Sequence, residues 1–200
     1  MSPEKYVKWV VTNVEEDLAR NGKRFPSKCV TQLLINYAPW LEYYPELMAE
    51  ITQQYQELIG KLRWTKDIVC LDILLETSLL SIYLVMPRVG HLEQAFHIFG
   101  YLKAHPKRKL GFDPGHPSIN KNKSQQCDWE EFYRHAKEET PGNMPVARGN
   151  FMSPHCFVDA NHAGDTETRR SQIGILLFCN SAPIIWFIKW QNSVESSTFG

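Results

Sequence analysis

The first part of the chain repeats apolar residues at steps of three and four, which places them on one face of a helix. The run begins at Val7 and ends at Leu18. Pro3 suits the first helical position, where its missing N–H costs nothing, and Gly22 suits a left-handed stop. The pattern predicts a helix from about residue 3 to residue 21.

The same helical spacing returns three more times along the first half of the sequence. It follows residue 53, runs from Asp72 to Met86, and runs again from Leu92 to Leu102. Pro87 and Pro106 end the last two runs, because proline lacks an N–H and clashes with the preceding turn. These runs predict a compact helical subdomain. The aromatic residues within it fall at core-like spacing, so we expect them to pack inside: Trp64, Phe96, Phe99 and Tyr101.

Two stretches lack such periodicity and carry several prolines. Residues 23–48 predict an extended loop, and residues 106–150 predict a linker with one short helix around Trp129 to Lys137. The chain therefore divides into a helical region at 1–105, the linker, and a distinct region at 151–200.

The last region changes to short β-prone runs separated by turn residues. The predicted strands are Cys156–Val158, Ile173–Cys179 and Ile184–Ile188. Turns at Ala163–Asp165 and Asn180–Pro183 are short enough for two successive antiparallel hairpins, and Ser193–Thr198 is expected to begin a helix. The prediction is an α+β chain in which a helical subdomain precedes a three-stranded antiparallel meander.

Composition and charge restrict the functions that this fold can carry. The 200 residues are 43% hydrophobic and 22% charged, which is ordinary for a folded chain. Lys and Arg total 22 and so do Asp and Glu, so any nucleic-acid contact must be local. Five cysteines without a C-x-x-C pair disfavour a disulfide framework or a zinc module. Neither a bilayer-spanning run nor a secretory signal is evident, which favours an intracellular location, cytoplasmic or nuclear.

The most notable acidic residue is Asp159, at the end of the first predicted strand. Asn161, His162 and Asp165 follow it closely, and a carboxylate in such a place can hold a divalent cation. Phosphodiester hydrolysis by two metal ions needs several converging carboxylates, however, and one strand cannot supply them. Taken alone, Asp159 and Asp165 are best interpreted as ordinary turn residues.

Two short basic clusters are candidate phosphate contacts. They are Lys107, Arg108 and Lys109 in the linker, and Arg169 with Arg170 before the second strand. In a chain without net charge, such clusters are more often solvated loop residues.

Several separated stretches together resemble the polymerase polyprotein of copia-type LTR retrotransposons. In the helical region the similar segments are Met1–Val7, Tyr55–Trp64, Asp72–Ile73, Leu79–Ser81, Pro87 with His91–Ala95, and Tyr101–Lys103. In the last region they are Phe157–Gly164, Thr168–Gly174, Ile184–Gln191 and Val194–Thr198. The first set resembles the thumb and connection region after the reverse transcriptase palm, and the second resembles the start of the ribonuclease H domain.

This resemblance implies a role for Asp159. It would be the first metal-binding carboxylate, holding Mg²⁺ against the scissile phosphate of an RNA strand paired with DNA. Asn161 departs from the acid usual two positions later. The polymerase palm would lie before Met1, and the next nuclease glutamate at or beyond Gly200. The resemblance therefore implies a truncated polyprotein fragment that is inactive alone and binds no Mg²⁺ tightly, with the remainder of the polyprotein as a possible partner.

Two other interpretations remain open at the level of sequence. The helical region and its basic run at Lys107 to Lys109 would suit a non-catalytic module that binds an RNA–DNA duplex or another polymerase chain. Alternatively, the fragment has no selected function, which poor folding would reveal.

Overall fold

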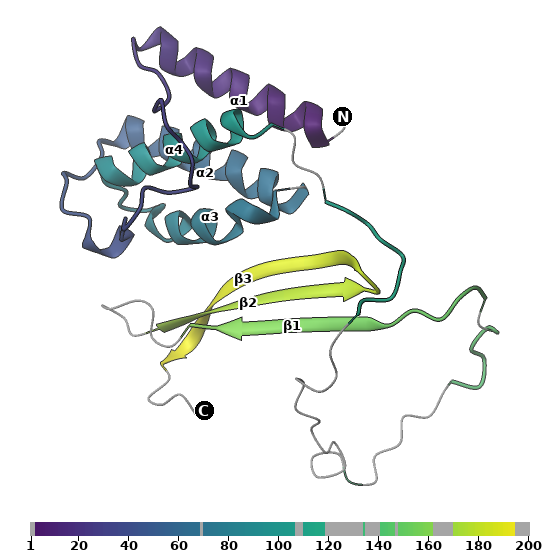
Figure 1. The fold of residues 1–200 in the computed structure, drawn as a ribbon. Coiled ribbons are helices and arrows are strands. Elements are labelled where there is room, and N and C mark those ends of the chain that lie inside the picture. The colour runs from purple at the N-terminus through teal and green to yellow at the C-terminus, as the bar shows by residue number, and fades with distance from the viewer. Residues whose placement is uncertain are drawn as a thin grey trace.

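The computed structural model describes residues 3–68, 70–106, 110–118, 134, 141–146, 148–161 and 170–194. Four α-helices precede a three-stranded antiparallel sheet in this part of the chain, so the fold is α+β. The helices form one layer, and the sheet lies along one side of it, next to α3 (Figure 1). The α-helices are α1 (Pro3–Arg20), α2 (Ala49–Ile68), α3 (Leu74–Leu80) and α4 (Val89–Ala104). The strands are β1 (Pro154–Ala160), β2 (Arg170–Cys179) and β3 (Ala182–Val194).

The first helix ends as its sequence predicts. Gly22 has a φ of 67°, and its N–H donates to the carbonyl of Ala19 at 3.0 Å. The N–H of Lys23 donates to the carbonyl of Leu18 at 2.9 Å. These two bonds form a Schellman motif, which satisfies carbonyls left open at the end of a helix.

The hydrophobic core lies among α1, α2 and α4. Its fully buried members include Val10, Tyr55, Ile59, Leu62, Ile98 and Phe99. Tyr101 is buried and Phe96 is partly buried, as expected, but the prediction that Trp64 packs inside was wrong, because its side chain is 58% exposed. The predicted loop at 23–48 contains the short 3₁₀ helix η1 (Pro39–Leu41). Cys29, earlier in the same loop, belongs to the core.

The helix expected from Asp72 to Met86 is broken into three pieces. The 3₁₀ helices η2 (Leu71–Ile73) and η3 (Ser81–Tyr83) flank the short α3. The Tyr55 hydroxyl donates to the carbonyl of Leu80 at 2.6 Å, and the Gln56 amide donates to the carbonyl of Leu84 at 2.8 Å. Side chains of α2 thus bind the carbonyl at the end of α3 and another just beyond η3.

The sheet is the predicted meander, with the strand order β1-β2-β3. Only Asn180 and Ser181 separate β2 from β3, and Asn180 has a left-handed φ of 56°. The prediction of a helix starting at Ser193 was wrong for its first two residues, since β3 continues to Val194, which pairs with Arg170. The Ala163–Asp165 turn and, apart from Arg134, the helix at Trp129–Lys137 lie outside the described residues.

Asn180 also fastens the sheet to the segment that precedes it. Its side-chain oxygen accepts from the N–H of Ser153, and its amide group donates to the carbonyl of Pro114, both at 2.8 Å. The N–H of Ser181 donates to the carbonyl of Gly115 at 3.1 Å.

Among the described residues, no helix combines the length and hydropathy that crossing a membrane requires.

Candidate functional site

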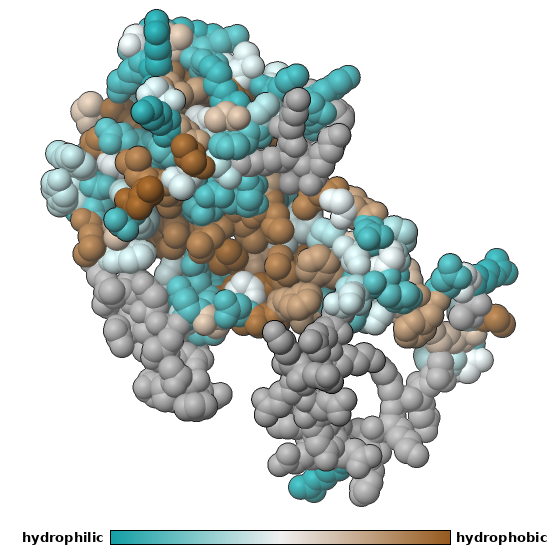
Figure 2. Space-filling model, in the orientation of Figure 1, coloured by the Kyte–Doolittle hydropathy of each residue, from teal (hydrophilic) through white to brown (hydrophobic). Residues whose placement is uncertain are grey.

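The largest described cavity that includes a predicted site residue lies between α3 and the sheet. It has a volume of about 700 Å³, and residues of the Leu71–Glu76 segment form one wall and the sheet forms the other. Figure 2 shows hydrophobic residues gathered where the helical part meets the sheet. Most of the lining is aliphatic or aromatic, and its acidic residues are Asp72, Glu76 and Asp159.

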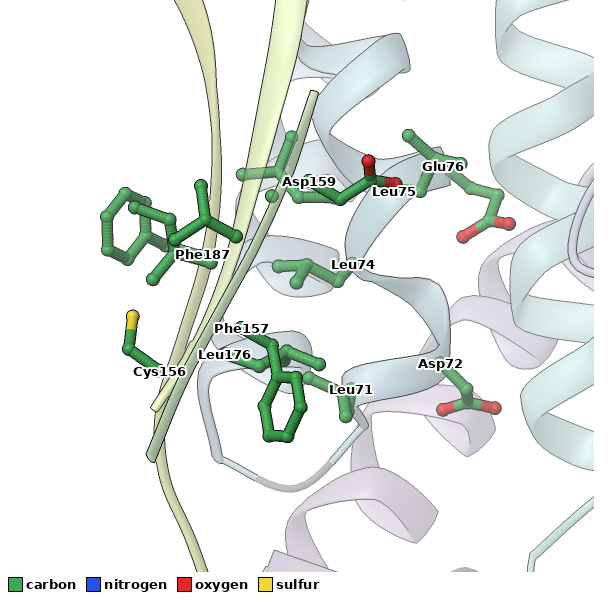
Figure 3. Close-up of a pocket in the computed structure, with 14 residues that line it drawn as sticks. Leu71, Asp72, Leu74, Leu75, Glu76, Cys156, Phe157, Asp159, Leu176 and Phe187 are labelled. Carbon is green, nitrogen blue, oxygen red and sulfur yellow. The ribbon is translucent and has the colours of Figure 1, made fainter. Parts of the chain in front are cut away.

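Strand register places Asp159 on the sheet face that looks toward the helices. Asp159 pairs with Gly174, which in turn pairs with Ile188. Residues directly opposite each other in a sheet share a face, and alternate residues point to opposite faces. Asp159, Phe157 and Leu176 accordingly point toward α3, whereas Cys156 and Phe187 point away from it (Figure 3).

Two hydrogen bonds hold this face of the sheet against the helices. The indole N–H of Trp186 donates to the carbonyl of Lys66 at 2.9 Å, near the end of α2. The amide group of Gln172 donates to the hydroxyl of Ser78 on α3 at 3.3 Å. The carbonyls in the last turn of a helix lack intrahelical partners, so the bond from Trp186 both caps α2 and positions β3.

The carboxylate of Asp159 is exposed in this cavity. Its partner on β2 is a glycine, so no side chain from that position covers it. Just beyond β1, the N–H of Asn161 donates to the carbonyl of Gln172 at 3.1 Å, and the Asn161 side chain accepts from the N–H of Gln172 at 2.6 Å. Asn161 therefore extends the pairing of the two strands instead of supplying a second carboxylate.

The other two acids of the cavity do not converge on Asp159. Their carboxylates lie on the side of α3 away from the sheet (Figure 3). Asp72 accepts a hydrogen bond at 3.1 Å from the Tyr101 hydroxyl, which itself accepts one at 2.9 Å from Gln32. Burial raises the pKa of Glu76, whose Oε2 has no hydrogen-bond partner in the described part of the chain. No group of three or more His, Cys, Asp or Glu residues in the described part of the chain is arranged to hold a metal ion.

The remaining predicted site residues have separate outcomes. Arg170 is exposed at the start of β2. Lys107, Arg108, Lys109 and Arg169 lie outside the described residues, as do His162 and Asp165. Their predicted roles stay predictions.

Two buried histidines of α4 have structural partners. Nδ1 of His91 accepts from the N–H of Arg88 at 2.9 Å, and its Nε2 lies 3.1 Å from the carbonyl of Pro39. Burial lowers the pKa of His91, in keeping with a neutral ring that donates from Nε2. Nε2 of His97 lies 3.0 Å from the carbonyl of Thr31. Both rings fasten the 23–48 loop to α4.

Reasoning from the sequence missed the Leu71–Glu76 wall of the cavity. The available signal was Glu76 itself, an acid within the apolar run that begins at Leu71. An acid in such a run indicates either a break in the helix or a specific environment.

Comparison with protein-family models, with curated proteins and with solved structures finds no match. Chemically, the site offers one open carboxylate beside an apolar wall.

Proposed function

We propose that this chain derives from the connection region of a copia-type retrotransposon polymerase, followed by the opening strands of its ribonuclease H domain. The observation that carries the proposal is the position of Asp159. It stands on the first strand of an antiparallel meander, with its carboxylate open and a glycine opposite. The resemblance assigns the first metal-binding carboxylate to this residue, and the segments that resemble the next two strands overlap β2 and β3 in part.

The described residues do not fit the pair of Mg²⁺ ions that the family uses. Two ions need several converging carboxylates. Asp159 is open, but Asp72 is bound by Tyr101, and Glu76 lies on the far side of α3. We therefore expect no cleavage of an RNA–DNA hybrid by this 200-residue chain alone.

A cleavage assay on a labelled RNA–DNA hybrid in Mg²⁺ tests the proposal. It compares the 200-residue chain with a chain extended along the downstream reading frame. The expected result is activity in the extended chain only, lost in Asp159→Asn. Asp17→Asn is the matched control, since this acid lies on α1 and pairs with exposed Arg20 at 3.1 Å. Cleavage by the shorter chain, or by an extended Asp159→Asn variant, would contradict the proposal.

Inactivity of both chains would leave two interpretations, a decayed remnant without a selected function and a duplex-binding module. That module predicts binding of an RNA–DNA duplex that weakens as salt rises, because phosphate contacts release counterions. Charge reversal at Lys107 and Arg108 should then weaken binding further and flatten its salt dependence. Binding that changes neither with salt nor with charge reversal at Lys107 and Arg108 would not support the duplex-binding module.

A further inference from the structure

A second cavity, unrelated to Asp159, lies where the 34–44 segment meets the first turns of α4. Its volume is about 340 Å³. Tyr43 and Tyr44 line it, with ring centroids 4.8 Å apart and ring planes inclined by 27°. Tyr43 is 79% exposed and Tyr44 is 45% exposed. Stacked tyrosines so open to solvent contribute little to the core, and they present aromatic faces to a ligand instead.

The cavity also contains a carboxylate that is held in position. Oε2 of Glu42 accepts from the Tyr37 hydroxyl, and its Oε1 accepts from the N–H of Tyr44, both at 3.1 Å. Gly90 makes room for this group, because a Cβ at that position would lie 1.7 Å from Oε2. Each carboxylate oxygen has a second lone pair, so Glu42 is fixed in place but can still accept from a ligand. A group that is already fixed loses little entropy on binding.

The charge of the cavity is negative. Glu42 and the exposed Glu93 line it, and no Lys or Arg is among its described lining residues. Arg88 is nearby, but its guanidinium donates to the carbonyl of Tyr44 at 3.0 Å and pairs with Glu46 at 3.4 Å. The pKa of Tyr44 is raised mainly by the adjacent Tyr43 hydroxyl and, to a smaller extent, by repulsion from Glu93 and Glu42. A cation is therefore the complementary ligand.

We propose that this cavity binds a guanidinium group, carried by an arginine side chain. The planar guanidinium stacks on aromatic rings and directs several N–H donors at a carboxylate, which a compact ammonium group does less well. Cavities that bind small molecules span roughly 300 to 1,000 Å³, and this one is at the lower end of that range, which suits a single side chain. The proposal does not depend on the retrotransposon origin of the chain.

A titration followed by ¹⁵N NMR tests the proposal with the intact chain. The probe is the peptide acetyl-Gly-Ser-Arg-Ser-Gly-amide at low salt, and the signals are the backbone amides of Gly90, Glu93 and Gln94. We expect saturable shifts of these three signals. The same peptide with citrulline, which is neutral and close in shape to arginine, should give none. A peptide with lysine should bind more weakly than the arginine peptide.

Variants at exposed positions locate the binding without endangering the fold. Tyr43→Leu and Glu93→Gln should each weaken binding about two- to five-fold, as expected for an exposed cation–π or charge contact. Gly90→Ala, in contrast, changes a buried position, and it should weaken binding as well because its methyl group displaces the Glu42 carboxylate. The matched control is Glu57→Gln, an exposed acid on α2 outside the cavity lining, which should leave the affinity unchanged.

A second probe distinguishes two sources of the guanidinium group, a small arginine compound and an arginine within a polypeptide. Acetyl-arginine-amide binding as tightly as the peptide would support recognition of the guanidinium alone. Tighter binding of the peptide would support recognition of an arginine within a polypeptide. Absence of saturable shifts with the arginine peptide, equal binding of the citrulline peptide, or equal weakening by Glu57→Gln and Glu93→Gln would overturn the proposal.

Discussion

Two helical glycines should respond in opposite directions to the same substitution. A Cβ added at Gly60 on α2 would meet no described atom within 4 Å beyond its own stretch of helix, whereas one added at Gly100 on α4 would lie 2.6 Å from Sγ of Cys29. Alanine is favoured over glycine inside a helix by about 1 kcal/mol. We therefore expect Gly60→Ala to raise the free energy of unfolding by about 1 kcal/mol.

At Gly100 the same gain is opposed by crowding. Cys29 is buried, and its thiol donates to the carbonyl of Pro26 at 3.4 Å and lies 3.8 Å from Nδ1 of His97. Moving it away disturbs both contacts, and overpacking a core typically costs about 1 to 3 kcal/mol. After the helical gain, we expect Gly100→Ala to lower the free energy of unfolding by up to about 2 kcal/mol.

Urea denaturation of both variants measures these changes, and a double-mutant cycle isolates the cause. In a Cys29→Ala background the sulfur is absent, so Gly100→Ala should lose its penalty. The coupling energy between the two substitutions should then be about 1 to 3 kcal/mol and favourable. Equal stabilisation by Gly60→Ala and Gly100→Ala, or a coupling energy near zero, would refute the close contact between α4 and the 23–48 loop.

Two further substitutions test buried polar groups. Tyr55→Phe removes the hydroxyl that donates to the carbonyl of Leu80 at 2.6 Å, so the free energy of unfolding measured in urea should fall by about 1 to 3 kcal/mol. Tyr43→Phe, at an exposed ring, should change the same free energy by less than about 0.5 kcal/mol. Burial raises the pKa of Glu76 above its ordinary 4.5, so its contribution to stability is fully present below pH 4.5 and is lost as pH rises through the folded-state value. Glu76→Gln should therefore be more stable than the unsubstituted chain at pH 8 and no more stable at pH 4; urea denaturation at both values checks this, and equal stability at pH 8 would contradict it.

Much of the secondary structure was accessible from the sequence. The first helix was predicted to within a residue or two because its periodic apolar face, its N-terminal proline and Gly22 all indicate the same limits. The meander was predicted because three β-prone runs alternate with turn residues. The candidate site was predictable in part. Asp159 at the end of a strand was evident, and strand alternation fixes which of its neighbours share its face.

The length of α3 and the surroundings of Asp159 were decided by tertiary structure. Local pattern favoured a helix from Asp72 to Met86, but α3 ends at Leu80, where the hydroxyl of Tyr55, distant in sequence, binds the Leu80 carbonyl. Likewise, nothing in the β1 sequence indicates that the Leu71–Glu76 wall stands opposite Asp159.

The physical reason is the range of the interactions. Helical periodicity, caps and turn residues act between neighbours in the chain, so the sequence by itself determined the limits of α1, the order of the helices and strands, and the alternation of side chains along each strand. Which apolar face meets which depends on contacts across large separations, such as Trp186 with Lys66. Those contacts decided that the sheet rests on α3, that Trp64 stays exposed, and that no second carboxylate of the described residues is directed at Asp159 in its cavity.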